Sequence, residues 1–275
     1  MADTRPIGVF DSGMGGLTVL RALMALLPSE RFIYLGDTAR LPYGTKSAET
    51  VEAYALQATR LLIEAGVKMV VVACNTASAV ALVPLMRQLA PVPVIGVIEP
   101  GARAGIAATR NKRIAVIATE STVKGGAYLR AIHAIDASVE VVQRPAQVFV
   151  ALAEEGWTDS TVTLAAARAY LVPLFDGASA PDTLVLGCTH FPVLVTSIRE
   201  AVGDKITIVD SAATTAASVA DALAAQGLAN EERAQGSSRF LATDSPERFA
   251  RVGEIFLGRK IDAKDVELID LRPST

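Results

Sequence analysis

Short apolar runs alternate along the chain with longer segments in which apolar residues recur every three or four positions. The short runs are rich in Val, Ile and Leu, which is typical of buried strands, and the longer segments are rich in Ala and Leu. This alternation predicts repeated strand-helix-strand units, which build mainly parallel sheets flanked by helices. We therefore expect an α/β fold.

The apolar runs predict two series of strands and helices. The first series has strands over 7–10, 32–35, 69–73 and 94–98, with helices over 17–27, 48–65 and 78–89. The second series has strands over 113–118, 139–143, 183–186 and 206–209, with helices over 123–135, 146–155, 162–174 and 193–201. Beyond them a polar loop over 230–238 precedes two short strands, over 239–243 and 266–269, around a helix that begins near Ser245.

Proline and glycine mark the expected crossing between the two series. The segment Pro91-Val92-Pro93 and a predicted turn at Glu99-Pro100-Gly101 stand there, and both residue types interrupt periodic segments. We accordingly divide the chain into a first α/β domain over 1–98, a second over 99–209 and a C-terminal segment over 210–275.

Composition mainly excludes classes of partner. With 51% hydrophobic and 20% charged residues, the chain of 275 residues can bury a sizeable core. Its net charge is −3 and no Lys/Arg cluster is interleaved with aromatic residues, so we expect no nucleic-acid partner. No basic-then-apolar signal opens the chain, and no apolar stretch approaches the roughly 20 residues of a membrane span. We expect a cytoplasmic protein with no membrane contact.

The two cysteines are the most informative residues. Cys74 and Cys188 each end an apolar run and stand directly before a turn that carries threonine. Candidate helix caps follow both of them, Asn75 and Thr76 in the first turn and Thr189 and His190 in the second. Positive helix ends would lower the thiol pKa values from their usual value of about 8.5. In a reducing compartment we expect free thiols rather than a disulfide.

Two further polar turns follow predicted strands, namely Asp11-Ser12-Gly13 and the segment from Asp37 to Gly44. Because the carboxyl ends of parallel strands meet at one edge, we expect these turns and the cysteine turns to form one ligand site. Asp11, Asp37 and His190 can each accept a hydrogen bond, orient a thiol or exchange a proton with it. The alternative for the aspartates is a turn or cap role.

Two other kinds of site fit parts of the pattern. The segment Gly13-Met14-Gly15-Gly16-Leu17-Thr18 is similar to a dinucleotide fingerprint, but threonine stands in place of its third glycine. A zinc ion held by Cys74, Cys188 and His190 would need an added carboxylate or water. We expect neither a metal nor a cofactor.

Five segments in this order resemble the glutamate racemases, cofactor-independent members of the aspartate/glutamate racemase superfamily. They are Gly8 to Gly13, Gly36 to Gly44, Ala73 to Ser78, Gly187 to His190 and Asp210 to Ala212. The resemblance implies two similar domains related by pseudo-twofold symmetry, an active site in the cleft between them and a C-terminal segment that returns to the first domain. It also implies a homodimer and a supply of D-glutamate for peptidoglycan.

The resemblance further implies roles for single residues. Cys74 and Cys188 match the two opposed acid/base residues of the family. Supporting positions are matched by Asp11, Asp37, Glu154 and His190. Substrate-binding positions are matched by Asp11, Ser12, Tyr43, Gly44, Asn75, Thr76, Thr189 and His190, and Thr119 and Thr122 are added because they follow a strand of the second series.

The resulting hypothesis is racemisation of glutamate by transfer of one proton at the α-carbon. One cysteine thiolate removes the proton, and the opposite thiol returns a proton to the other face. By resemblance, Cys188 deprotonates L-glutamate and Cys74 deprotonates D-glutamate. Two alternatives stay open, namely a racemase of aspartate or another small amino acid, and a non-catalytic binding or thiol-redox protein of the same fold.

Overall fold

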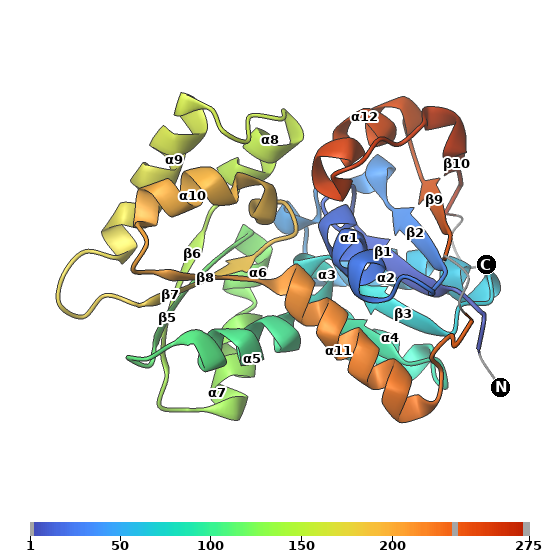
Figure 1. Ribbon diagram of the computed structural model, residues 1–275, viewed down its shortest axis with the longest axis horizontal. Coiled ribbons are helices and arrows are strands. Elements are labelled where there is room, and N and C mark those ends of the chain that lie inside the picture. Colours follow the sequence, from blue (N-terminus) through green and yellow to red (C-terminus); the bar gives the residue numbers. More distant parts are fainter. Residues whose placement is uncertain (1–2, 233–235, 272–275) are drawn as a thin grey trace.

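Two parallel sheets lie side by side in the computed structural model, which describes residues 3–232 and 236–271 (Figure 1). The first sheet has the order β10-β9-β2-β1-β3-β4, with strands at Ile7–Asp11 (β1), Phe32–Gly36 (β2), Met69–Val72 (β3), Val94–Gly96 (β4), Ser238–Ala242 (β9) and Val266–Leu268 (β10). The second has the order β6-β5-β7-β8, with strands at Arg113–Ala118 (β5), Glu140–Pro145 (β6), Thr183–Gly187 (β7) and Thr207–Asp210 (β8). The expected α/β fold is confirmed.

Helices flank both sheets. Those next to the six-stranded sheet are Leu17–Leu26 (α1), Ala48–Glu64 (α2), Asn75–Val80 (α3), Leu82–Gln88 (α4) and Pro246–Leu257 (α12). Those next to the four-stranded sheet are Ile98–Ala108 (α5), Glu120–Lys124 (α6), Ala127–Ile135 (α7), Val148–Glu154 (α8), Thr161–Leu171 (α9) and Val195–Val202 (α10). Short 3₁₀ turns lie at Thr38–Arg40 (η1), Tyr43–Thr45 (η2), Val172–Leu174 (η3), Phe191–Leu194 (η4) and Ala263–Asp265 (η5). No helix within the described ranges is both long and apolar enough to cross a membrane.

Local sequence explains several helix starts. Ser47, Ser160 and Asp210 precede α2, α9 and the helix α11 (Ser211–Gln226), and each side chain accepts a hydrogen bond from a backbone N–H of the first turn. Such caps satisfy amide donors that have no partner inside the helix. The boundaries therefore follow from single residues rather than from average propensity.

Three expectations for the elements are wrong. The turn predicted at Glu99-Pro100-Gly101 belongs to the first residues of α5, where proline is tolerated because its missing N–H would have no helical partner. The helix predicted over 123–135 is divided into α6 and α7, and Gly126 adopts the left-handed conformation at the break, with φ of 61°. The predicted helix over 78–89 is likewise divided into α3 and α4 near Ala81.

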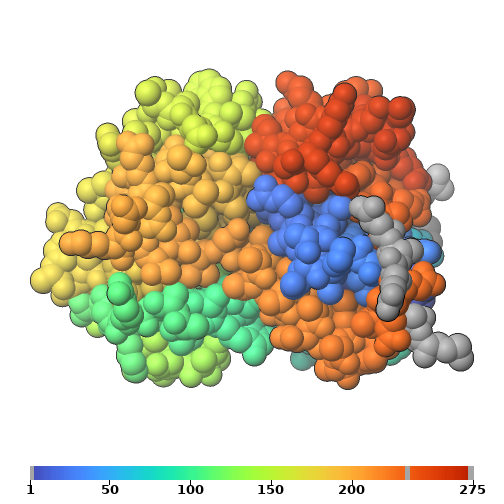
Figure 2. All heavy atoms as spheres, in the orientation of Figure 1, coloured from blue at the N-terminus to red at the C-terminus, as the bar shows by residue number. Residues whose placement is uncertain are grey.

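The molecule has two halves, each built around one of the two sheets. Helix α11, which the sequence pattern did not predict, joins them. It packs on α1 beside the six-stranded sheet and on α5 beside the four-stranded sheet, and it crosses between them in the ribbon view (Figure 1). Beyond it the chain returns to the first sheet, where β9 pairs in parallel with β2. The space-filling view shows the two halves in contact along their boundary (Figure 2).

The domain boundaries expected after residues 98 and 209 stay predictions. Within the predicted polar loop over 230–238, residues 233–235 lie outside the described residues.

A buried ion pair fixes the edge of the first sheet opposite the strands' carboxyl ends. Lys68 Nζ lies 2.6 Å from Glu30 Oε2, and the two side chains are 0% and 4% exposed. The same ammonium donates to the carbonyls of Asp3 and Leu228 at 2.7 Å each. Asn230 N donates to Glu30 Oε1 at 2.8 Å. The pair thus holds the start of the chain and the segment after α11 against the sheet.

We predict that Lys68→Met lowers the free energy of unfolding by about 3–5 kcal/mol, because it leaves a buried carboxylate without its cation. Urea denaturation followed by circular dichroism measures the change. Lys124→Met is the matched control, since it breaks an ion pair with Glu120 in which both side chains are at least half exposed. The control should cost at most about 1 kcal/mol. Equal losses in the two variants would contradict a structural role for the buried pair.

Candidate active site

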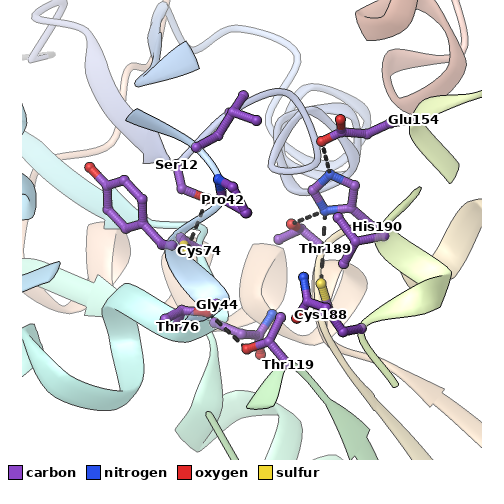
Figure 3. A pocket seen from close by; sticks show the side chains of 16 residues that line it. Ser12, Pro42, Gly44, Cys74, Thr76, Thr119, Glu154, Cys188, Thr189 and His190 are labelled. Atoms are coloured by element: carbon purple, nitrogen blue, oxygen red, sulfur yellow. Dashed lines mark hydrogen bonds and ion pairs between the residues drawn. The ribbon is translucent and has the colours of Figure 1, made fainter. Parts of the chain in front are cut away.

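Strands from both sheets end at one cavity. Ser12 follows β1 and Cys74 lies just beyond β3, while Thr119 follows β5 and Cys188 follows β7. These are neighbouring strands in each sheet, so the parallel order brings four polar turns together. Figure 3 shows Cys74 and Cys188 on opposite sides of the cavity.

Most of the residues expected at a site do line this cavity. They are Ser12, Tyr43, Gly44, Cys74, Asn75, Thr76, Thr119, Glu154, Cys188, Thr189 and His190. Asp11, Asp37 and Thr122 do not line it and contact lining residues or their neighbours instead. Gln147 and Val150 also line the cavity, although they lie outside the turns expected at the site, whereas Leu41 lies within the expected segment from Asp37 to Gly44. Only the structure marks Gln147 as a candidate site residue. Its Oε1 is buried and has no hydrogen-bond partner among the described residues.

The two aspartates that were expected to support the site lie just behind it. Asp11 is fully buried and its Oδ2 accepts from Gly13 N at 2.9 Å. Burial raises the pKa of this carboxyl, although the positive charge of His190 opposes the shift. Asp37 accepts from the Tyr43 hydroxyl and from Arg40 Nε, the latter at 2.6 Å. Asp37 therefore holds the Tyr43-Gly44 segment that forms one wall of the cavity.

Cys74 serves as the cap of helix α3. Its Sγ accepts from Ala77 N at 3.4 Å, and its thiol donates to Ser12 Oγ at 3.5 Å. The expectation of a lowered pKa is wrong for this thiol. Burial raises its pKa to about 12, and nearby Asp11 acts in the same direction, so the amide donor at the helix start does not compensate. Cys74 is therefore a neutral thiol near pH 7.

Cys188 has different surroundings. His190 Nδ1 lies 3.8 Å from Cys188 Sγ, and His190 Nε2 lies 3.2 Å from Glu154 Oε1. The other oxygen of Glu154 accepts from Arg248 Nη2 at 2.9 Å. Arg248 is on α12 and Glu154 ends α8, so a chain of charged groups runs from one half of the molecule across to the thiol of the other. Sequence spacing gave no sign of Arg248.

This chain sets the charge of His190. Burial alone would lower the pKa of the imidazole, but its hydrogen bonds to Cys188 and Glu154 and the negative charges of Cys188 and Asp11 raise it to about 10. Burial also acts to raise the pKa of Glu154, yet the hydrogen bond and charge of His190, with those of Arg248, lower it overall. At neutral pH the cavity thus holds an imidazolium between a carboxylate and Cys188.

The imidazole is closely packed on two sides. A Cβ atom added to Gly15 would lie 2.4 Å from His190 Nδ1 and 2.5 Å from Thr189 Oγ1. Phe256 covers the ring edge-on, with centroids 5.0 Å apart. The close backbone approach at Gly15 requires glycine and holds the ring against Cys188.

Hydroxyl and amide groups link the two halves across the cavity. Thr76 Oγ1 lies 3.0 Å from Thr119 Oγ1, which lies 3.0 Å from Thr122 Oγ1. Thr18 Oγ1 donates to Thr189 O at 3.1 Å. These hydrogen bonds hold one neutral thiol and one thiol beside an imidazolium on opposite faces of the same space. Such a pair can remove a proton from one side of a bound carbon and return one to the other.

Comparisons with known proteins agree on one family. The family model for Asp/Glu/Hydantoin racemase matches residues 13–219. A glutamate racemase from Geobacter metallireducens is 50% identical over 257 residues, which is 94% of this chain and 94% of that protein.

Two crystal structures show the same fold. One is a glutamate racemase isoform from Bacillus anthracis, with a TM-score of 0.91, 36% identity and 98% of each chain covered. The other is a glutamate racemase from Francisella tularensis in complex with D-glutamate, with a TM-score of 0.89, 36% identity and 98% of each chain covered.

We predict that Glu154→Gln lowers the pKa of His190 from about 10, because the variant removes the carboxylate that stabilises the imidazolium. We expect the pKa of His190 to fall by about 1 or more. In the wild type, protonated His190 stabilises the fold fully below its ordinary pKa of 6.5, and the contribution disappears as pH rises through about 10. The stability difference between wild type and variant should therefore shrink toward high pH.

Nuclear magnetic resonance titration of the imidazole signals measures the shift directly. The chain has two histidines, so His133→Gln identifies the signal of His190. An unchanged midpoint in Glu154→Gln would show that Glu154 does not control the charge of His190.

Proposed function

The chain belongs to the Asp/Glu/Hydantoin racemase family, and from that premise we propose that it interconverts L-glutamate and D-glutamate without a cofactor. One observation carries the proposal. Two buried thiols lie on opposite sides of one cavity, and each has its own partner for proton exchange, Ser12 for Cys74 and His190 for Cys188. The shared name of the relatives supports glutamate as the substrate.

The proposed reaction uses the unequal charges of the two sides. The Cys188 thiolate, balanced by the imidazolium of His190, takes the α-proton of L-glutamate and becomes a thiol. The neutral Cys74 thiol then gives its proton to the opposite face of the carbanion and becomes a thiolate. The product is D-glutamate, and the reverse reaction begins from that second protonation state. Inversion follows because the proton leaves on one face and arrives on the other.

Hydrogen-bond donors around the cavity must hold the carboxylates and the charge that develops on the substrate. Hydroxyls of Ser12, Thr76, Thr119 and Thr189 line the cavity and are at least partly buried. Fixed donors in a site with little water stabilise negative charge more strongly than the same donors in bulk water. The proposed role of these side chains is therefore binding and charge stabilisation, with Tyr43, Gly44 and Asn75 completing the walls.

The proposal extends to the setting of the reaction. D-Glutamate made in the cytoplasm would supply peptidoglycan synthesis, and the working unit would be a homodimer. Within each protomer, closure of the two halves, taken as residues 1–98 and 99–209, would exclude water from the carbanion. The cross-cavity hydrogen bond between Thr76 and Thr119 supports a closed arrangement.

The decisive experiment is a racemisation assay on purified protein without pyridoxal phosphate. We predict that L-glutamate is converted to an equal mixture of enantiomers, and that L-aspartate reacts at least about 100-fold more slowly, because the cavity must match the side-chain carboxylate. Chiral chromatography measures both. Turnover of aspartate alone would transfer the proposal to aspartate. No turnover, together with a reversible disulfide between Cys74 and Cys188 by thiol counting, would favour the redox alternative.

We further predict that Cys74→Ala and Cys188→Ala each lower racemisation by at least about 10²–10⁴-fold while the protein stays folded, because each removes one proton partner. In heavy water, the wild type should place solvent deuterium in the product enantiomer early, while recovered substrate stays nearly unlabelled. Equal early labelling of both enantiomers would indicate one shared base. Full racemisation by folded Cys74→Ala would refute the two-cysteine scheme.

A further inference from the structure

Tyr128 stands behind the cavity and touches both cysteine turns. It lies on α7 and is fully buried. Its ring packs against Gly187, the residue before Cys188, so closely that a Cβ atom there would lie 2.9 Å from Tyr128 Cε2. Its hydroxyl reaches the other half of the molecule, where it contacts Asn75, the residue after Cys74. Tyr128 is thus placed to transmit the geometry of one turn to the other.

The direction of this hydrogen bond fixes the orientation of an amide. Tyr128 Oη donates to Asn75 Oδ1 at 2.8 Å. Burial raises the pKa of the Tyr128 phenol, so the hydroxyl keeps its proton and remains a donor. A hydroxyl has a single hydrogen to donate, and the asparagine oxygen is the group that can accept it. The amide is therefore held with its oxygen toward Tyr128.

The other end of the same amide has no partner. Asn75 is 2% exposed and lines the cavity, and its Nδ2 is buried without a hydrogen-bond partner among the described residues. A buried donor pair without an acceptor is costly in a folded protein, so its retention indicates that a ligand supplies the acceptor. A carboxylate is the fitting group, because an ionised carboxylate only accepts hydrogen bonds.

We propose that Tyr128 is a positioning residue, which holds the Asn75 amide so that Nδ2 donates to a carboxylate of the bound amino acid. The inference rests on the proposed function, since it assumes an amino-acid substrate in the cavity. Without the phenol hydroxyl, the amide can rotate by 180° about its last bond and present its oxygen to the carboxylate, where two acceptors repel each other. Tyr128 then acts on substrate binding without touching substrate.

The test is a double-mutant cycle with Tyr128→Phe and Asn75→Ala. Tyr128→Phe keeps the ring that packs on Gly187 and should raise the Kd and KM for glutamate about 3- to 10-fold. Its effect on kcat should be smaller than its effect on KM. In the Asn75→Ala background the same change should have no further effect, because the group that Tyr128 positions is absent. Calorimetry with D-glutamate and the racemisation assay measure binding and turnover separately.

Two further variants provide a control and an independent test of the Nδ2 donor. Tyr170→Phe is the matched control, since Tyr170 lies on α9 with its ring 5.5 Å from that of Phe149 and is not among the residues that line the cavity. It should leave Kd and KM unchanged. Asn75→Asp keeps the acceptor for Tyr128 but removes the Nδ2 donor, so it should weaken glutamate binding by at least about 10-fold with the fold intact by circular dichroism. This variant decides the question if Tyr128→Phe does not fold.

The outcomes separate the inference from the proposed function. A wild type that neither binds nor racemises glutamate refutes the proposed function, and the inference with it. An active wild type with unchanged binding in folded Tyr128→Phe refutes the inference alone. Equal losses from Tyr128→Phe in the wild-type and Asn75→Ala backgrounds would show a general packing effect instead. Wild-type affinity in Asn75→Asp would exclude Nδ2 as the carboxylate donor.

Discussion

The burial of two thiols in one cavity is the constraint on which the rest of this structure depends. Burying a thiolate costs free energy unless a positive charge or fixed hydrogen-bond donors replace the lost water. Cys74 receives one backbone amide and remains a neutral thiol, whereas Cys188 has the His190 imidazolium beside it. The two sides therefore differ in charge although both follow central strands of parallel sheets. In the proposed reaction, this difference separates the base from the acid before substrate arrives.

Keeping that difference requires contacts that cross between the halves. The imidazolium depends on Glu154, and Glu154 depends in part on Arg248 from α12, which is built by the C-terminal segment. This gives a physical reason for the chain to return to the first sheet, where β9 and β10 hold α12 in position. The buried pair of Lys68 and Glu30 secures the same return at the opposite edge. Remote parts of the fold thus maintain one charge state.

The sequence predicted the parts of this arrangement that depend on local pattern. Within residues 3–232 and 236–271, apolar runs identified all ten strands to within about two residues. The polar turns after β1, β3 and β7 identified most of the cavity. The pattern did not reveal α11, because its small residues, such as Ala216 and Ala222, give a weak periodic signal. It also failed for the charge of Cys74, because helix-end amides are visible in a sequence whereas the depth of burial is not. Arg248 contacts Glu154, and Tyr128 contacts Asn75, across long stretches of sequence. Patterns of local spacing cannot predict such contacts.

The cavity poses one further problem for a dicarboxylate. Among the described residues that line it there is no Lys or Arg, and the cation in contact with Cys188 is His190. A strongly basic wall would bind glutamate tightly in its ground state, which lowers KM without helping the proton transfer. Neutral hydroxyls and amides hold the carboxylates with less charge, and they leave the imidazolium as the nearest positive group to the thiolate that takes the proton. In the proposed reaction, neutral side chains bind the substrate carboxylates, and His190 serves the proton transfer at Cys188. The carboxylates therefore do not need to pair with the imidazolium, which remains available to balance the thiolate.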